Sequence, residues 1–357
     1  MSRTRQVALL LLAVVVIGGA LYWVFLHERR PAAPTQLAGL AAVPADAGLA
    51  GGVEAAALGR QQWLVDIVKR ASGEVDEAAD YRAFVEATGF DYTRDLERLW
   101  FGAAGTDAAP VFVFVAEGRF ARDRIQSYAR QEGAAASTYE GLELFEFRTA
   151  PAPPAGAPPQ PERRSAFAFL DDTHLAFVFG PDTGALRRAI DCWQGRAPAV
   201  IADAGRRAEF ERVAAGQQAW AVIEPAKLNP AQLVGQPGDP GLSELITQAA
   251  LGLSATESGL RISAEGRCRQ AEHAERLHSN LTVLSQLGRM ALARDPNPQS
   301  QALAEVLGTL ELDRNDTAVT ARLNVSPQAL DALLRPPAAA GPPPTQPPAG
   351  KKPTGKK

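Results

Sequence analysis

Cysteine and lysine are scarce in this chain of 357 residues, which has two cysteines and six lysines. The isolated residues Cys192 and Cys268 are too few for a disulfide scaffold and too far apart in sequence for a zinc site. We expect buried free thiols, with a disulfide between them as the alternative if the protein lies outside the cytoplasm. The scarcity of lysine, beside abundant arginine, alanine and proline, suggests a GC-rich bacterial genome.

Recognisable catalytic and nucleotide-binding motifs are also missing. The sequence has no GxGxxG, P-loop, EF-hand or GxSxG pattern. The net charge of the chain is −3. Because the first 30 residues contribute +3 and the last 22 contribute +4, residues 31–335 alone carry a charge of −10. An acidic folded region repels phosphate, so we exclude nucleic acid as a partner. We expect no cofactor and no catalytic residue, and we lean against an enzyme.

Two histidines of one predicted helix resemble a metal motif at first sight. His273 and His278 are five residues apart, which places their rings about 140° apart around a helix and prevents them from sharing one ion. We therefore expect no metal site, and a stripe of this helix facing the core instead. The stripe consists of Ala274, Leu277, Leu281, Leu284 and Ala291.

One long apolar run stands near the start of the chain, from Val7 to Leu26, and includes Leu12, Ile17 and Trp23. Twenty residues at 1.5 Å per residue span about 30 Å, the thickness of the hydrocarbon core of a bilayer. The run is too long for a secretory signal peptide, and the flanking arginines favour a cytoplasmic N-terminus. These features predict a transmembrane signal anchor in the bacterial inner membrane, with residues 31–357 in the periplasm or outside the cell and membrane lipid as a partner.

Changes in composition divide the chain into segments. Residues 1–6 are the predicted cytoplasmic N-terminus, 7–26 the anchor, and 27–44 a stalk rich in proline and alanine. Two α+β regions follow, at 45–230 with a low-complexity insert at 149–161, and at 231–335. Residues 336–357 form a tail rich in proline and lysine that we expect to be disordered.

One unit recurs in the folded part: a strand, a short junction, then an amphipathic helix. The predicted strands are 111–115, 175–179, 260–264 and 319–325, and the helices that follow are 121–132, 183–194, 269–293 and 327–334. Alternating strands and hairpin turns at 171–172 and 314–316 favour an α+β class with mainly antiparallel sheets. The sequence AEGR at both 116–119 and 264–267 suggests an internal duplication, although chance identity is an alternative.

The repeated AEGR supplies the candidate functional residues. Glu117 and Arg119, like Glu265 and Arg267, are two residues apart and point to one face of a strand, where they would form solvent-exposed ion pairs. In the alternative, Glu117 and Glu265 meet across a pseudo-twofold axis as an acid and a base. His174 follows Asp171 and Asp172 at a predicted hairpin tip, where turn formation explains these residue types.

The stretch Val43-Pro44-Ala45-Asp46, with the residues that follow it up to Leu58, resembles the opening of an outer domain in uncharacterised bacterial envelope proteins with a single membrane span. The resemblance covers residues 43–58 and the general plan of the chain. It implies an extracytoplasmic domain that begins near residue 43, and it implies no activity.

We therefore expect a membrane-anchored binding or assembly protein of the bacterial envelope with an unknown envelope protein as partner, or a homo-oligomer. Two alternatives stay open. One is an envelope hydrolase with a dispersed active site, and the other is a structural subunit of an inner-membrane complex.

Overall fold

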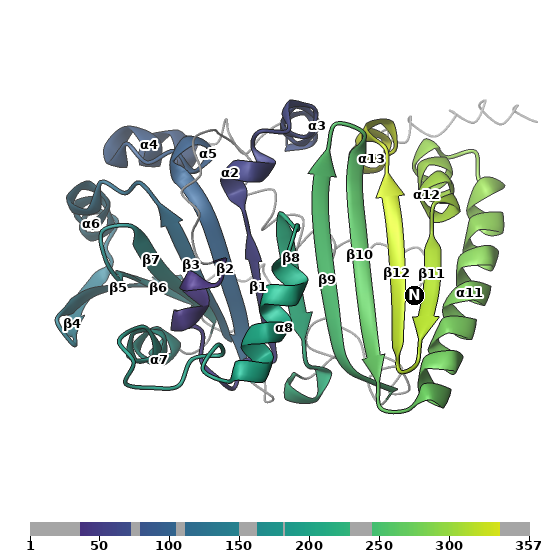
Figure 1. Cartoon of the computed structure of the whole chain (residues 1–357). Coiled ribbons are helices and arrows are strands. Elements are labelled where there is room, and N and C mark those ends of the chain that lie inside the picture. The colour runs from purple at the N-terminus through teal and green to yellow at the C-terminus, as the bar shows by residue number, and fades with distance from the viewer. Residues whose placement is uncertain are drawn as a thin grey trace, which may run out of the picture.

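Twelve strands form one antiparallel sheet in the part of the chain that the computed structural model describes, which is residues 36–72, 79–104, 111–149, 163–180, 183–228 and 245–335 (Figure 1). The strand order is β11-β12-β10-β9-β8-β1-β2-β3-β7-β6-β5-β4. Helices pack on this sheet, so the fold is α+β with an antiparallel sheet. The sequence predicted several sheets, whereas these strands form a single sheet.

The strands are β1 (Leu49–Val53), β2 (Leu96–Ala104), β3 (Val111–Gly118), β4 (Ala135–Tyr139), β5 (Leu142–Thr149), β6 (Arg163–Phe169), β7 (His174–Gly180), β8 (Ala219–Ile223), β9 (Ile246–Thr256), β10 (Gly259–Cys268), β11 (Glu311–Asn315) and β12 (Ala318–Val325). The helices are η1 (Ala38–Ala42), α2 (Ala55–Leu58), α3 (Gln62–Ser72), α4 (Ala79–Thr88), α5 (Tyr92–Asp95), α6 (Arg122–Gln131), α7 (Gly184–Trp193), α8 (Ala204–Ala214), η2 (Pro225–Lys227), α11 (Ala271–Ala293), α12 (Pro298–Gly308) and α13 (Pro327–Leu334).

Side chains at the helix ends explain several of these boundaries. Ser326 accepts a hydrogen bond from the Ala329 amide at 3.1 Å and Pro327 follows it, which begins α13 at the predicted position. Asp203 accepts from the Arg206 amide at 2.7 Å and begins α8 in the same way. The four predicted strand–helix units are thus confirmed as β3–α6, β7–α7, β10–α11 and β12–α13.

The two halves of the sheet have the same strand order when counted outward from its centre. One half runs β1-β2-β3-β7-β6 and the other runs β8-β9-β10-β12-β11, while β5 and β4 extend only the first. At the centre Gly51 of β1 lies opposite Ala221 of β8. Both copies of AEGR end equivalent strands, β3 and β10. The same strand order in both halves is what an internal duplication predicts.

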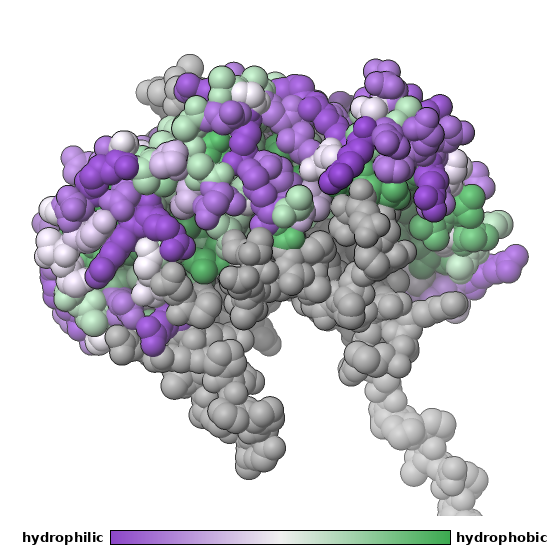
Figure 2. All heavy atoms as spheres, turned by 90° about the horizontal axis from the view of Figure 1, so that it is seen from below, coloured by the Kyte–Doolittle hydropathy of each residue, from purple (hydrophilic) through white to green (hydrophobic). Residues whose placement is uncertain are grey.

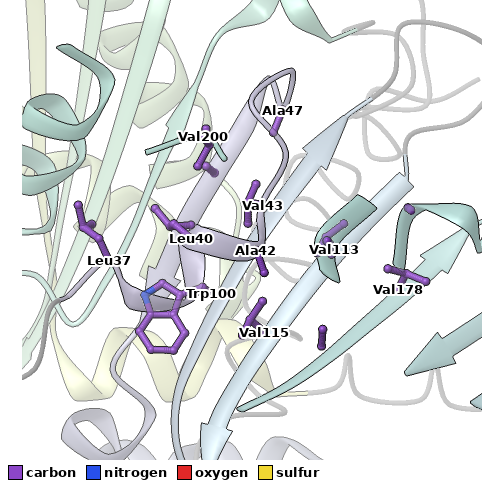
Figure 3. Packing of buried hydrophobic residues seen from close by; sticks show 14 of the residues in the cluster. Leu37, Leu40, Ala42, Val43, Ala47, Trp100, Val113, Val115, Val178 and Val200 are labelled. Carbon is purple, nitrogen blue, oxygen red and sulfur yellow. The ribbon is translucent and has the colours of Figure 1, made fainter. Parts of the chain in front are cut away.

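A large core cluster lies on the face of the sheet that is turned to the viewer in Figure 1, which we call the front face. There η1, α7 and α8 lie in front of the strands. Trp100, Val115 and Val178 project from β2, β3 and β7 into this cluster (Figure 3). Because side chains alternate along a strand, their neighbours project to the back face, where Leu99, Ala116 and others pack with α2, α3, α12 and α13.

The prediction of a fold that opens with a transmembrane helix is wrong for the described residues. None of their helices is long and apolar enough to cross a membrane. The longest, α11, has 23 residues but includes Glu272, Glu275 and Arg276. A charged side chain at the centre of a bilayer costs about 3 kcal/mol. The predicted anchor, Val7–Leu26, lies outside the described residues.

Part of the predicted stalk is instead core. Leu40 and Val43 are completely buried, and the Val200 amide donates to the Val43 carbonyl at 2.8 Å. These apolar side chains fill the space between Trp100 and the neighbouring strands, so the chain is held against the sheet from η1 onward. The predicted boundary at 230/231 falls between β8 and β9, which pair in one sheet.

Both cysteines are free and buried, as predicted. Burial raises the pKa of the Cys192 thiol to about 11 and also raises that of Cys268. Because the thiolate is the reactive form, we expect iodoacetamide at pH 8 to label Cys192 about 100-fold more slowly in the native protein than in urea, and to label Cys268 more slowly as well. Mass spectrometry of quenched samples measures this. Rapid labelling of Cys192 in the native protein would contradict its burial.

Candidate functional site

The predicted acid–base pair does not form. Glu117 lies on β3 and Glu265 on β10, and the strands β2, β1, β8 and β9 separate them in the sheet. At about 4.8 Å per strand, their backbones are roughly 24 Å apart. The two glutamates thus occupy equivalent strands of the two halves and lie far from each other, so the hypothesis of shared acid–base work fails.

The predicted ion pairs have different outcomes in the two halves. Glu265 and Arg267 pair at 2.9 Å, which confirms the prediction for the second copy. Glu117 pairs with Arg98 of β2 at 2.7 Å, whereas Arg119 pairs with Asp95 at 3.0 Å, so the prediction is wrong for the first copy. The reason is that Arg98 lies directly opposite Glu117 in the β2–β3 register, closer than a residue beyond the end of the strand.

Glu117 belongs to a row of polar side chains that crosses four neighbouring strands, which we call the Arg98 cluster. Its members are Glu54, Arg98, Glu117, Asp171 and His174. The Arg98 guanidinium contacts Glu54 at 3.2 Å and Glu117 at 2.7 Å, and the side chain of Arg98 is only 9% exposed. His174 lies opposite Glu117 on β7, and its Nδ1 is 3.0 Å from Asp171 Oδ2.

Burial and hydrogen bonding shift the pKa values of two carboxyl groups in the Arg98 cluster. Loss of solvent raises the pKa of Glu54, and nearby Glu117 adds to this, while Arg98 opposes it. Burial alone would raise the pKa of Asp171, but hydrogen bonds from the Thr173 amide and from His174 bring it below the ordinary value. One buried arginine thus holds two carboxylates that would otherwise repel each other.

The Arg98 cluster has the residue types of an acid–base site, but its histidine is largely buried. His174 Nε2 is buried without a hydrogen-bond partner and lies 3.9 Å from Glu117. The rings of Trp193 and Trp100 pack against the imidazole, with centroids 4.9 and 6.1 Å away. These rings occupy the space that a substrate would need on their side of His174. We interpret the cluster as an ion network that joins β1, β2, β3 and β7.

Glu265 belongs to a similar network in the second half. Arg212 of α8 contacts Glu209 at 2.7 Å and Glu265 at 2.9 Å, and Arg267 contacts the same two carboxylates. These contacts raise the pKa of Arg212, and hydrogen bonds from Arg212 are the main cause of the lowered pKa of Glu209. The network ties α8 to the front face of β10.

The exposed side of α11 is a feature that the sequence analysis missed. Ala274 and Leu277 are buried as predicted, but Leu284 is 64% exposed and Ala291 is exposed, so the predicted core stripe is wrong at its C-terminal end. Leu284 forms an exposed apolar stripe with Val283, Leu287 and Met290, each at least 54% exposed. Hydrophobic surface gathers at the end of the molecule where α11 lies (Figure 2).

Two arginines stand at the ends of this stripe. Arg276 and Arg294 are 18 residues apart, which is five helical turns and about 27 Å, so both lie on the side of α11 that carries Leu287. Both are exposed, and neither guanidinium has an ion-pair or hydrogen-bond partner among the described residues. We call Arg276, the four apolar residues and Arg294 the α11 surface.

Metal ligation has no support in the described ranges. No group of three or more His, Cys, Asp or Glu side chains there is placed to hold a metal ion. His273 lies partly buried on α11, with its Nδ1 unpartnered.

The chain belongs to the DUF3352 family, whose model matches residues 7–306 and is described as a protein of unknown function. No curated protein matches the chain. Among solved structures it is similar to TP0453 in crystal form III, with 11% identity over 83% of this chain and 96% of that chain and a TM-score of 0.49. Crystal form I of TP0453 gives 10% identity, 85% and 97% coverage and a TM-score of 0.44. Likenesses of this size identify no function.

Proposed function

We propose that this protein is a binding or assembly protein that holds an amphipathic helix of a partner protein along the α11 surface. The observation that carries the proposal is the exposure of four large apolar side chains in one stripe of a helix whose adjacent side packs on the sheet. Apolar residues spaced i, i+4 and i+7 are the anchors through which helices recognise each other. Leaving them in water costs about 25 cal/mol per Å² of apolar area, which a partner helix would recover.

Charge decides between partners. In a pair of α11 helices from two copies, an antiparallel arrangement centred on the stripe would bring Arg276 of one copy near Arg294 of the other. A parallel arrangement would bring each arginine to its own equivalent. Both arrangements place like charges together, which disfavours self-association. A partner helix with an apolar stripe and a carboxylate at each end satisfies both arginines.

The alternatives have less support. A hydrolase needs a nucleophile, or an acid and a base, open to substrate, whereas the His174 side chain of the Arg98 cluster is only 13% exposed and packs against the rings of Trp100 and Trp193. A structural subunit of a larger complex would use the same α11 surface. The location in the bacterial envelope stays a prediction.

A pair of synthetic helices tests the proposal. One 21-residue peptide carries leucines at heptad positions a and d and glutamates at both ends, and the other replaces the glutamates with lysines. We expect the full-length protein to bind the glutamate peptide at least tenfold more tightly in 50 mM salt, measured by fluorescence anisotropy, and less tightly in 500 mM salt. The double variant Leu284→Ser, Leu287→Ser should lose this binding.

The arginines supply the matched control. R276E/R294E should reverse the preference toward the lysine peptide, while R289E, on the other side of the helix, should leave it unchanged. Equal affinity for both peptides, or no binding of either at 500 µM, would overturn the proposal. Two other results would overturn it as well: a stripe-dependent dimer in sedimentation equilibrium, or stripe-dependent binding to vesicles of anionic lipid.

A further inference from the structure

A second surface, on the front face of the same half of the sheet as α11, points to a small ligand rather than to a protein. The end of α8 and the loop after it stand beside β9, β10 and β12, and together they line an open hollow of about 250 Å³. No helix drawn in Figure 1 lies in front of β10 and β12. We infer that this hollow binds an anionic ligand about the size of a monosaccharide, through a carboxylate or phosphate held between Arg261 and Arg322.

The two arginines are neighbours on the sheet. Arg322 of β12 lies opposite Ser263 of β10, so Arg261 is its diagonal neighbour on the same face. Diagonal Cβ atoms are about 7 Å apart, a distance over which two guanidinium groups can share one anion. Both arginines are exposed, and neither has an ion-pair partner in the described ranges. Glu311 lies opposite Arg322 on β11 but makes no ion pair with it.

The carboxylate that lines the hollow, Glu265, already forms ion pairs with other arginines. Glu265 is held by Arg212 and Arg267, both at 2.9 Å, so it does not neutralise Arg261 or Arg322. Two cations that form no ion pair with any described residue favour a ligand that brings its own negative charge.

The floor of the hollow is shaped by glycine and lined with polar groups. A Cβ atom on Gly252 would lie 2.7 Å from Ser263 Oγ and 2.8 Å from Gln217 Cδ, so only glycine leaves room for both side chains. The side-chain amide of Gln217 and the hydroxyl of Thr320 line the same space, and neither group makes a hydrogen bond within the described residues. These groups suit hydroxyl oxygens on the rest of the ligand.

Size and chemistry define the class. Pockets for drug-sized ligands measure about 300–1,000 Å³, so the hollow takes a smaller molecule. A sugar acid and a sugar phosphate share the required features, which are one anionic group and several hydroxyls.

The test compares sugars that differ in charge, titrated into the full-length protein by isothermal calorimetry at constant ionic strength. We expect glucuronate or glucose 6-phosphate to bind with a dissociation constant in the millimolar range, and glucose at least tenfold more weakly. A preference between the two anions identifies which group the arginines hold. Equal binding of glucose and both anions, or no binding of any at 20 mM, would overturn the inference.

Variants locate the site. R261Q/R322Q should weaken binding of the preferred anion at least tenfold, because both side chains are exposed and their replacement leaves the core intact. G252S should weaken it by crowding Gln217. R314Q removes an exposed arginine of β11 and should change nothing. Unchanged binding by R261Q/R322Q would overturn the inference, whereas loss of peptide binding at α11 would leave it standing, because the two surfaces are separate.

Discussion

Replacing Arg98 with methionine is expected to lower the free energy of unfolding at pH 7 by about 3–5 kcal/mol, the range found when one partner of a buried ion pair is removed. The variant leaves Glu54 and Glu117 facing each other, largely buried and without their shared cation. Urea unfolding followed by circular dichroism measures the loss. The matched control is R207M, because Arg207 and Glu211 are both more than half exposed. It should cost about 0.5 kcal/mol or less.

The pH dependence of the stability of R98M shows whether the loss is electrostatic. Burial already raises the pKa of Glu54 above its ordinary value of 4.5, and loss of Arg98 removes the group that opposes this rise. A carboxyl whose pKa is raised in the folded state favours folding while it is protonated, and this contribution is lost as the pH rises through the folded-state pKa. The deficit of R98M should therefore shrink as the pH falls from 7 toward 4. The Arg98 guanidinium also lies over the Trp100 ring, 5.8 Å from its centroid, and a deficit that is the same at every pH would assign the loss to this packing instead.

Replacing Trp100 with alanine is expected to cost about 3–5 kcal/mol, as for other buried aromatic residues. The side chain is 1% exposed, and its Nε1 donates to the Gln36 carbonyl at 2.9 Å. A Cβ on Gly39 would lie only 2.1 Å from the indole, so η1 is packed directly on this ring. The variant should also release residues 37–43 from the sheet, measured as faster amide exchange at Leu40 and Val43.

Trp193 supplies the comparison for this variant. It is only partly buried and packs at the edge of the same cluster, so W193A should cost less than half as much. If W100A and W193A were equally stable, or if exchange at Leu40 did not change, the role assigned to Trp100 in holding η1 would be wrong.

Local patterns predicted the units of this fold well. The amphipathic helices predicted at 183–194 and 327–334 are α7 and α13, because helix periodicity and capping depend on a few neighbouring residues. The repeated AEGR indicated equivalent strands. Nothing local indicated how the two copies pair, because Gly51 and Ala221 are 170 residues apart in the chain.

The candidate surfaces were harder to predict. α11 has two apolar sides, one through Leu277 and one through Leu287, about 80° apart around the helix. Periodicity reports that a side is apolar, and only the position of the sheet and of α12 decides which side is covered. The hollow at Arg261 and Arg322 joins three strands and α8, so no single stretch of sequence contains it.

By itself the sequence determined the α+β class, the strand–helix units, the turns and the acidic charge of the folded region, because each follows from backbone preference or composition over a few residues. The tertiary structure decided that Glu117 pairs with Arg98, that Leu40 and Val43 are core, and that the end of α11 is exposed. Those outcomes depend on which strand lies next to which, and that is fixed by the lowest free energy of the whole sheet rather than by any segment of it.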